Sequence, residues 1–560
     1  MASFPLRRAL AMAVFSALVG CASMPREQGL SDIHTLVDQR NGAALGWAAD
    51  HETETKTAAT IQTLLSVPLT ADTAVQIALL RNPRMQSEYA RLGIAQADVF
   101  DASRISNPTF SITALHKSGE PTKFDGGLTV PFAELLMLPA RKRFAAGEYA
   151  RTQQSIGAAI LNLASDTRAA WYTYVGAEQV ATMRAAVATA AQTSADTAAK
   201  FHEAGNISVL QLKMEEAAAT QARLQATRAG AEAVRARSVL NQLMGVSGAS
   251  TQWTATNRLP APLAQDDSAD ALVTLAHQQR LDLTAARQEV TLLEQSLGVT
   301  KQYRWLGKVD VGVAGERETD RTKLYGPSLS LQLPIFNQGQ GAIARANAQL
   351  DDSRARVQSL EREIDANVRL GVDRIAAAHK IAEDYRDALI PQREIIVART
   401  QERVNFMLVG VFELLLAKQQ EFDAYQRYLE AVRDYWMARV DLMRAVGARL
   451  PSDGDAANGT VGPDEILQPA PDASMQHTHH AGGEMPGMDM SGEKAMGGAS
   501  SATTETKKPV SPDPHADHDM NAMPGMSMPA NAPPEKKPDN PTKPTEGSEN
   551  TTHDQHGGAA

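Results

Sequence analysis

Methionine and histidine side chains gather in two short clusters near the C-terminal end of the chain. The same order of residue types occurs in both: His477, His479, His480, Met485, Met488 and Met490, and then His515, His518, Met523, Met526 and Met528. Each cluster contains the pattern Met-Pro-Gly-Met-x-Met. Thioethers are soft ligands that select Cu(I) and, by the same softness, Ag(I), while imidazole also suits Cu(II). The pattern predicts a segment that binds these ions as cargo, with no obligatory cofactor. The alternative is a methionine-bearing linker without a ligand role.

These clusters lie in a segment with an unusual composition. From Pro451 to Ala560 the chain has no Phe, Tyr or Trp, yet it holds fifteen of the 28 prolines and nine of the twenty methionines. Such a segment cannot bury enough apolar surface to offset the entropy lost on ordering. We therefore expect residues 451–560 to form a disordered metal-binding tail.

The N-terminal residues predict export and a lipid anchor. Two arginines precede an apolar run from Ala9 to Val19, which suits a secretory signal and is too short to span a membrane. The run ends in Leu-Val-Gly-Cys, which resembles the bacterial lipobox and implies cleavage before Cys21 and acylation of its thiol. Cys21 is the only cysteine, so an intramolecular disulfide is excluded. The alternative is an ordinary signal peptide cleaved near an alanine.

Four short segments in the body of the chain alternate apolar with small or polar residues: Thr109–Leu115, Gly127–Phe132, Val309–Val313 and Ser328–Leu333. A period of two gives a strand one apolar and one polar face, as in membrane β-barrels. The alternative is a half-buried sheet in a soluble protein. Small closed membrane barrels begin at about eight strands, so four strands require an oligomer. Three copies would supply twelve.

Long helices are expected between these strands. No proline occurs between Pro139 and Pro260, and the stretch is rich in residues that favour helix. A helix from Pro139 to His202 would be roughly 95 Å long. A second helix is expected from Gly341 to Met407, with a kink or break at Pro391. Helices so rich in alanine must pack closely on one another, either in a helical barrel or, alternatively, in an isolated dimeric coiled coil.

The pattern of elements occurs twice, at offsets of 198 to 205 residues. The corresponding sites are Asn82–Met85 with Arg280–Leu283, Gly127–Phe132 with Leu329–Ile335, Gly205 with Gly410, and Gly245 with Gly447. Each copy predicts a helix, two strands, a very long helix, a tight reversal and a further helix. A period of this length indicates two copies of one architectural half, and not a short-repeat solenoid.

Several of these residues resemble those of a known family. They are Ala78-Leu79 before Asn82-Pro83, the strand-ending Pro131 and Pro334, and the reversals at Gly205–Leu210 and Val409–Leu415. Over about residues 65 to 450 the chain resembles the TolC-type outer-membrane efflux proteins. The resemblance implies a homotrimer with a twelve-stranded barrel in outer-membrane lipid and a helical tunnel in the periplasm. It also implies a tip that docks on a membrane-fusion adaptor, which couples the channel to an inner-membrane pump.

The resemblance further points to a periplasmic gate at Glu413. In TolC-type channels, acidic residues just after the reversal ring the closed tip, and Glu413 holds a matching position, whereas Leu416 departs from the pattern. Aligning back from Gly245 and Gly447 places Glu413 opposite Gln211 and makes the second reversal three residues shorter than the first. Three Glu413 side chains around a threefold axis would repel one another and attract cations. The alternative role for Glu413 is to stabilise its helix N-terminus through the dipole.

The combined prediction is an α+β fold with two internal repeats, in which a trimeric membrane β-barrel of four strands per chain continues into a long periplasmic α-helical barrel. The divisions are a signal peptide at 1–20, a periplasmic segment at 21–64, repeats at 65–255 and 256–450, and the tail. The net charge of −10 gives no reason to expect nucleic-acid binding. No phosphate-binding loop, nucleophile elbow or HExxH pattern occurs, so no enzyme is expected.

We therefore expect a lipid-anchored channel in the Gram-negative outer membrane, with its helices and tail in the periplasm, that exports copper or silver as part of a tripartite efflux system. One alternative is a multidrug or protein-secretion duct in which the tail has no role in transport. Another is a lipid-anchored periplasmic protein that sequesters metal and conducts nothing.

Overall fold

A computed structural model describes residues 30–41, 51–116, 118–454 and 459–467 of the chain. All of them belong to one compact unit, residues 1–476, and a second unit, residues 477–560, lies outside the described residues. The fold below is that of the first unit.

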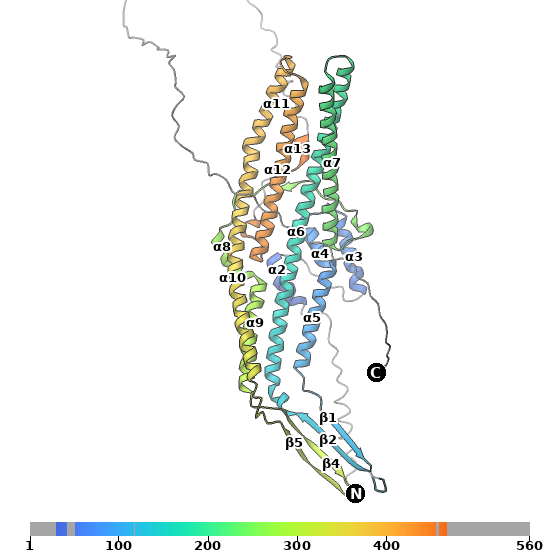
Figure 1. Ribbon diagram of the computed structural model, residues 1–560, viewed down its shortest axis with the longest axis vertical. Helices are drawn as coiled ribbons and strands as arrows, with labels where there is room; N and C mark the ends of the chain where they lie inside the picture. The colour runs from blue at the N-terminus through green and yellow to red at the C-terminus, as the bar shows by residue number, and fades with distance from the viewer. Residues whose placement is uncertain (1–29, 42–50, 117, 455–458, 468–560) are drawn as a thin grey trace, which may run out of the picture. The chain divides into compact units, whose positions relative to one another are not determined.

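The first part of this unit starts with two short helices, continues through two further helices and two strands, and ends in one long helical hairpin. The elements are α2 (Leu30–Asn41), α3 (His51–Leu65), α4 (Ala71–Arg81), α5 (Pro83–Ala102), β1 (Thr109–Leu115), β2 (Lys123–Pro131), α6 (Phe132–Glu203) and α7 (Val209–Met244). The strands lie at one end of the long helices, and the reversal between α6 and α7 lies at the other (Figure 1).

The second part follows a linker that contains η1 (Gly248–Thr251) and β3 (Leu259–Pro260). Its elements are α8 (Ala269–Gln279), α9 (Leu281–Gln302), β4 (Val309–Arg317), β5 (Lys323–Leu331), α10 (Gln340–Glu383), the π-helix η2 (Asp384–Leu389), α11 (Ile390–Asn405) and α12 (Val411–Val446). The chain continues through η3 (Pro451–Gly454), β6 (Thr460–Val461) and α13 (Pro463–Leu467). Strand β6 pairs with β3 in the linker.

The order helix, helix, strand, strand, long helix, reversal, helix therefore occurs in residues 71–244 and again in residues 269–446. We call these stretches the N-terminal half and the C-terminal half. The long helices of the two halves lie side by side, and α6 packs against α9 and α12. That the halves are two copies of one unit stays a prediction.

The predicted start of the first long helix is wrong. Helix α6 begins at Phe132, directly after β2, so Pro139 lies inside it. A proline in a helix lacks one N–H donor, but this single lost bond is small beside the remaining bonds of a 72-residue helix. The predicted end at His202 is confirmed to within one residue. No helix in the described ranges combines the length and the apolar composition that crossing a membrane requires.

The predicted interruption at Pro391 is confirmed. Helix α10 passes into the π-helix η2, and α11 resumes with Pro391 in its first turn. The proline ring would collide with the carbonyl of Asp387, four residues earlier, in a regular α-helix. The wider π turn relieves that collision.

The four long strands form one antiparallel sheet in the order β1-β2-β4-β5, with β1 and β5 at its open edges. Residues directly opposite one another share a face, and the register pairs Phe110 with Leu128, Leu128 with Val313, and Val311 with Leu329. The side chains on this apolar face are exposed in the single chain, at 70% for Phe110 and 60% for Val313. The predicted alternation is therefore confirmed.

The opposite face of the sheet is polar. Lys123 of β2 forms ion pairs with Glu316 of β4 and with Glu318, which follows β4. Asp125 is directly opposite Glu316 on the same face. One chain thus forms an open sheet with two unlike faces, and it does not close into a barrel by itself.

The core lies where the long helices of the two halves meet. Four aromatic rings make a chain of contacts, with successive centroids 5.2 to 5.5 Å apart, in the order Trp171 and Tyr172 of α6, then Trp436 and Tyr435 of α12. Tyr172 and Trp436 are stacked, and the other two pairs meet edge to face. Close approach of α6 to α12 depends on Gly176, because a Cβ there would lie 2.5 Å from the Cδ of Arg433. Small residues at helix contacts were expected from the sequence, and this contact confirms the expectation locally.

Candidate functional site

The described residues contain only one of the side chains that the sequence singled out for function. The metal-ligand clusters at 477–490 and 515–528 and the lipidation site Cys21 lie outside the described residues. Glu413 lies in the first turn of α12, next to the reversal that joins α11 to α12. Within the described ranges, no group of three or more acidic, histidine or cysteine side chains is arranged to hold a metal ion.

The first reversal, between α6 and α7, has a defined hydrogen-bond pattern. Gly205 has a φ of 74°, and its N–H donates to the carbonyl of His202 at 2.9 Å. The N–H of Asn206 donates to the carbonyl of Phe201 at 2.8 Å. This pattern ends the helix with one left-handed residue, a conformation that glycine adopts at least cost.

The second reversal reproduces this pattern with different residues. Met407 has a φ of 57°, its N–H donates to the carbonyl of Val404 at 2.8 Å, and the N–H of Leu408 donates to the carbonyl of Arg403 at 2.9 Å. Residues 204–208 and 406–410 connect the helices, so the two reversals have the same length. The prediction of a shorter second reversal is therefore wrong. Met407, and not Gly410, is the counterpart of Gly205.

Glu413 and Gln211 occupy equivalent positions in the third residue of their helices. The N–H of Gln211 donates to the hydroxyl of Ser208 at 3.2 Å, which caps α7. Gly410 precedes α12 and offers no side chain for such a cap. The carboxylate of Glu413 is exposed and lies at the positive end of the α12 dipole, where a negative charge is favourable.

A groove of about 710 Å³ lies between the starts of α7 and α12. Its walls include Leu210, Gln211 and Met214 from α7, and Glu413 and Leu416 from α12. Glu413 and Gln211 therefore line one groove, whereas the ring of three Glu413 side chains requires two further chains. Most of the groove surface is apolar. The sequence predicted a charged side chain at this place, Glu413, but not the apolar residues around it.

The exposed apolar surface continues over the second reversal. Phe406, Met407 and Leu408 have exposures of 77%, 93% and 69%. Three consecutive large apolar side chains in a loop are unusual on a monomeric protein, and they indicate a surface that contacts another molecule.

Far from the reversals, the junction between α4 and α5 holds the C-terminal end of α7. The side-chain amide of Asn82 donates to the carbonyl of Leu243 at 2.7 Å, while its oxygen accepts from the N–H of Arg84 at 2.8 Å. Gly245 ends α7 with a φ of 67°, and a Cβ there would lie 2.9 Å from the carbonyl oxygen of Arg81. One amide thus caps two helices.

The junction between α8 and α9 does the same with two side chains. Arg280 donates to the carbonyl of Ala445 at 3.0 Å, and Asp282 accepts from the N–H of Leu283 at 2.9 Å. Arg280 and Asp282 also form a bidentate ion pair. Burial alone would raise the pKa of Asp282, but the Arg280 guanidinium outweighs burial and holds that pKa below its usual value. Gly447 ends α12 with a φ of 74° beside Arg280.

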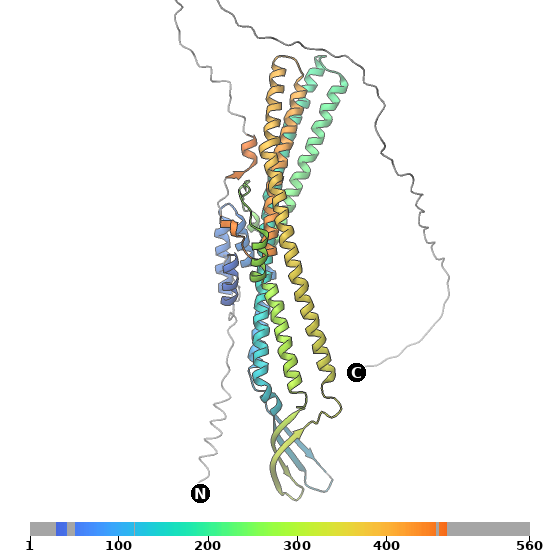
Figure 2. The ribbon, with the colours of Figure 1, turned by 90° about the vertical axis from the view of Figure 1, so that its left-hand side faces the viewer.

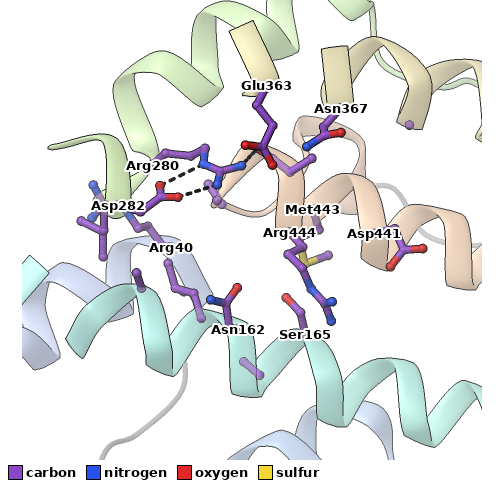
Figure 3. Close-up of a pocket in the computed structure, with 18 of the residues that line it drawn as sticks. Arg40, Asn162, Ser165, Arg280, Asp282, Glu363, Asn367, Asp441, Met443 and Arg444 are labelled. Atoms are coloured by element: carbon purple, nitrogen blue, oxygen red, sulfur yellow. Dashed lines mark hydrogen bonds and ion pairs between the residues drawn. The ribbon is translucent and has the colours of Figure 1, made fainter. Parts of the chain in front are cut away.

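A cavity of about 350 Å³ adjoins this second junction. Figure 3 shows side chains from α2, α6, α9, α10 and α12 around it, with the Arg280–Asp282 pair at one side and Arg444 at the other. Arg444 forms an ion pair with Asp166 of α6. Arg40 of α2 donates to the carbonyl of Gln279 at 3.0 Å. The cavity is therefore a place where the N-terminal segment and both halves are joined by ion pairs and hydrogen bonds.

No protein-family model and no curated protein sequence matches the chain. Solved structures do match its fold. A membrane protein from Pseudomonas aeruginosa superposes with a TM-score of 0.59 at 16% identity, over 67% of this chain and 92% of that one. The Campylobacter jejuni CmeC outer membrane channel gives a TM-score of 0.57 at 16% identity, over 69% of this chain and 87% of that one.

CusC, described for its folding and transmembrane channel formation, gives a TM-score of 0.57 at 16% identity, over 68% of this chain and 93% of that one. This chain has the fold of an outer-membrane channel. The structural neighbours thus support the predicted TolC-type architecture at the level of the fold.

Proposed function

We propose that this protein is the outer-membrane channel of a tripartite efflux system, and that it works as a homotrimer with a periplasmic adaptor and an inner-membrane pump. The observation that carries the proposal is the open sheet with one exposed apolar face and two unpaired edges. Edge β1 runs antiparallel to edge β5, because the four strands alternate in direction. Three copies joined edge to edge would therefore close a barrel of twelve antiparallel strands.

In such a barrel the apolar face would meet outer-membrane lipid and the polar face would line the water-filled interior. The long helices would continue the channel into the periplasm. The chain would act as a conduit for material driven by the pump, and it would catalyse no reaction.

Fractionation of the outer membrane, heat-modifiable migration of the trimer and single-channel recording test this proposal together. We expect an outer-membrane trimer that conducts ions. A protein that fractionates with the outer membrane but neither forms a heat-sensitive trimer nor conducts would instead be the lipid-anchored sequestration protein.

We further propose copper or silver as the cargo, captured by residues 451–560. The support is the pair of methionine and histidine clusters, whose soft ligands suit Cu(I) and Ag(I). Replacing Met485, Met488, Met490, Met523, Met526 and Met528 by Leu should abolish most Cu(I) binding, measured by competition with a chromophoric chelator, and leave histidine-dependent Cu(II) binding. Unchanged Cu(I) affinity would remove the metal assignment. A deletion strain sensitive to drugs and not to copper would identify a multidrug duct.

Lipidation at Cys21 is part of the same proposal. We expect the mature chain to begin at Cys21 and to incorporate radioactive palmitate, and the Cys21→Ala variant not to do so. Palmitate labelling of Cys21→Ala would contradict it, since no other thiol is present.

The gate is proposed at Glu413. Three carboxylates at a threefold axis would bind divalent or trivalent cations and block the closed pore. Glu413→Ala should weaken this block in planar-bilayer recordings, while the matched variant Gln211→Ala should change it little. Equal block in both variants and the wild type would show that the gate lies elsewhere.

A further inference from the structure

The long helical segments of the two halves, α6 and α10–α11, differ in their continuity. Helix α6 runs through 72 residues, whereas α10 and α11 are separated by the π-helix η2. The N–H of Ile390 donates to the carbonyl of Tyr385, five residues back, which is the bond that defines a π turn. Such turns hold one residue more than an α-helical turn and are often found at functional sites. Figure 2 shows α10 continuing through this turn into the hairpin that α11 forms with α12.

Just before the π turn, α10 is fixed to its surroundings by His379. Its Nδ1 lies 3.1 Å from a carboxylate oxygen of Asp266 in the segment before α8. Its ring meets the ring of Tyr435 on α12 edge to face, with centroids 5.6 Å apart. The hydroxyl of Tyr435 donates to the other oxygen of Asp266 at 3.0 Å. Glu383, one turn further along α10, lies 3.6 Å from the Nε2 of His379.

The same carboxylate ties α12 to the residues that follow it. The Arg439 side chain is 2% exposed and lies 3.3 Å from Asp266 and 2.6 Å from Asp453. It also donates to the hydroxyl of Ser452 at 2.9 Å. We call His379, Asp266, Tyr435, Arg439 and Asp453 the clamp. A buried arginine shared by two carboxylates is costly to separate from them, so the clamp holds α10 and α12 together at this level.

Beyond the π turn the restraint is weak. Ile390 is the only buried side chain of α11 in the described chain, and Ile395 is 61% exposed. The groove of about 710 Å³ separates the start of α12 from α6 and α7. An ion pair joins α12 to α6 in this region, where Asp423 lies 3.0 Å from Arg184. It is partly exposed and therefore contributes little.

We propose that the π turn at Asp384–Leu389 is the hinge on which the α11–α12 hairpin moves away from the α6–α7 hairpin, while the clamp keeps α10 in place. A π turn allows this movement because its extra residue can pass to a neighbouring turn without loss of the helix on either side. Helix α12 follows by bending, as long helices do. This inference rests on the proposed function as a channel, whose opening it would control.

Two variants remove the hinge without touching the groove. Deleting the exposed Ala388 takes out the extra residue and restores α-helical register on both sides. Pro391→Ala restores the missing N–H and removes the ring that favours the π turn. Each should lower the open fraction of the full-length trimer in planar bilayers by about tenfold, equivalent to ~1.4 kcal/mol or roughly one net hydrogen bond. His379→Ala should act in the opposite direction, because α10 then loses its contacts with Asp266 and Tyr435 just before the hinge.

Pro139→Ala is the matched control, since Pro139 lies inside α6, where no π turn is present. It should leave the open fraction unchanged. If Pro391→Ala forms trimers that open as often as the wild type, the hinge is wrong, whether or not the Ala388 deletion assembles. A wild-type trimer that does not conduct would overturn the proposed function and the hinge with it.

Discussion

The N-terminal and C-terminal halves reach the same backbone geometry with different side chains. At the helix junctions, the amide of Asn82 alone does what Arg280 and Asp282 do as a pair. At the reversals, Met407 takes the left-handed conformation that Gly205 takes in the other half. The comparison teaches that the positions of donors, acceptors and left-handed residues define this architecture, and that the residue types can vary within those requirements.

The largest expected difference concerns the glycines that end α7 and α12. In Gly245→Ala the new Cβ meets backbone atoms of Arg81, which cannot move away, whereas in Gly447→Ala it meets the side chain of Arg280 first. We expect the free energy of unfolding to fall by about 3 kcal/mol for Gly245→Ala and by about 2 kcal/mol for Gly447→Ala. Urea denaturation of the solubilised protein measures both. Equal losses would mean that the two junctions are equally rigid.

The next effect concerns the junction side chain of the N-terminal half. Asn82→Ala removes the cap of α5 and leaves the carbonyl of Leu243 without its donor, so we expect a loss of about 2 kcal/mol. Asn82→Asp should keep the side-chain oxygen that caps α5 but lose the N–H that donates to the carbonyl of Leu243. Urea midpoints that place Asn82→Asp level with the wild type would show that the contact with Leu243 contributes nothing.

The stability contributed by the C-terminal junction should depend on pH, unlike that of the N-terminal junction, because it includes the carboxylate of Asp282. The folded-state pKa of Asp282 lies below its unfolded value, so its contribution is present above the unfolded pKa and is lost as pH falls through the folded pKa. We expect Asp282→Asn to lower the free energy of unfolding by about 1 kcal/mol near neutral pH, a modest value because the side chain is partly exposed. The deficit should shrink toward pH 3. A deficit independent of pH would point to lost packing.

The smallest effect is expected at the reversals. Met407→Gly relieves the strain of a left-handed methionine but increases the entropy of the unfolded chain, so we expect a net gain of about 0.5 kcal/mol. Gly205→Ala should lose about 1 kcal/mol by the reverse argument. Thermal midpoints of the two variants should therefore move in opposite directions. A loss of stability in Met407→Gly would show that the exposed thioether makes a contact in the assembled protein.

Local signals in the sequence predicted most of the elements. Strand alternation, Asn82-Pro83 at a helix junction and Pro391 at a helix interruption act on the backbone nearest to them, so their effects could be read without knowing the fold. The start of α6 was missed because Pro139 usually marks a helix beginning, and a long helix tolerates one missing donor. The pairing of Gly205 with Gly410 was wrong because a residue other than glycine, Met407, takes the left-handed conformation in the second reversal.

The site was less accessible to sequence reasoning. His379 contacts Asp266, which is 113 residues away in the sequence, and Arg439 contacts the same carboxylate from 173 residues away. Neither contact produces a short sequence motif that could be recognised. The apolar groove beside Glu413 is lined by α6, α7 and α12, and its residues Gln211 and Glu413 are 202 positions apart in the sequence. Only the fold brings such residues together. Glu413 itself was found through the resemblance to a family.

The strand order has a consequence for the order of events in biogenesis. The pairing of β2 with β4 joins Pro131 to Asp310, and it closes a loop of about 180 residues. Contacts this distant in sequence form slowly, whereas a hairpin such as α6–α7 forms from neighbouring residues. We expect the sheet to be the last part of the chain to fold. A nascent chain that still lacks the C-terminal half has the edge strand β1 but not the edge strand β5, so it cannot yet form the edge-to-edge pairing that would join one copy to the next.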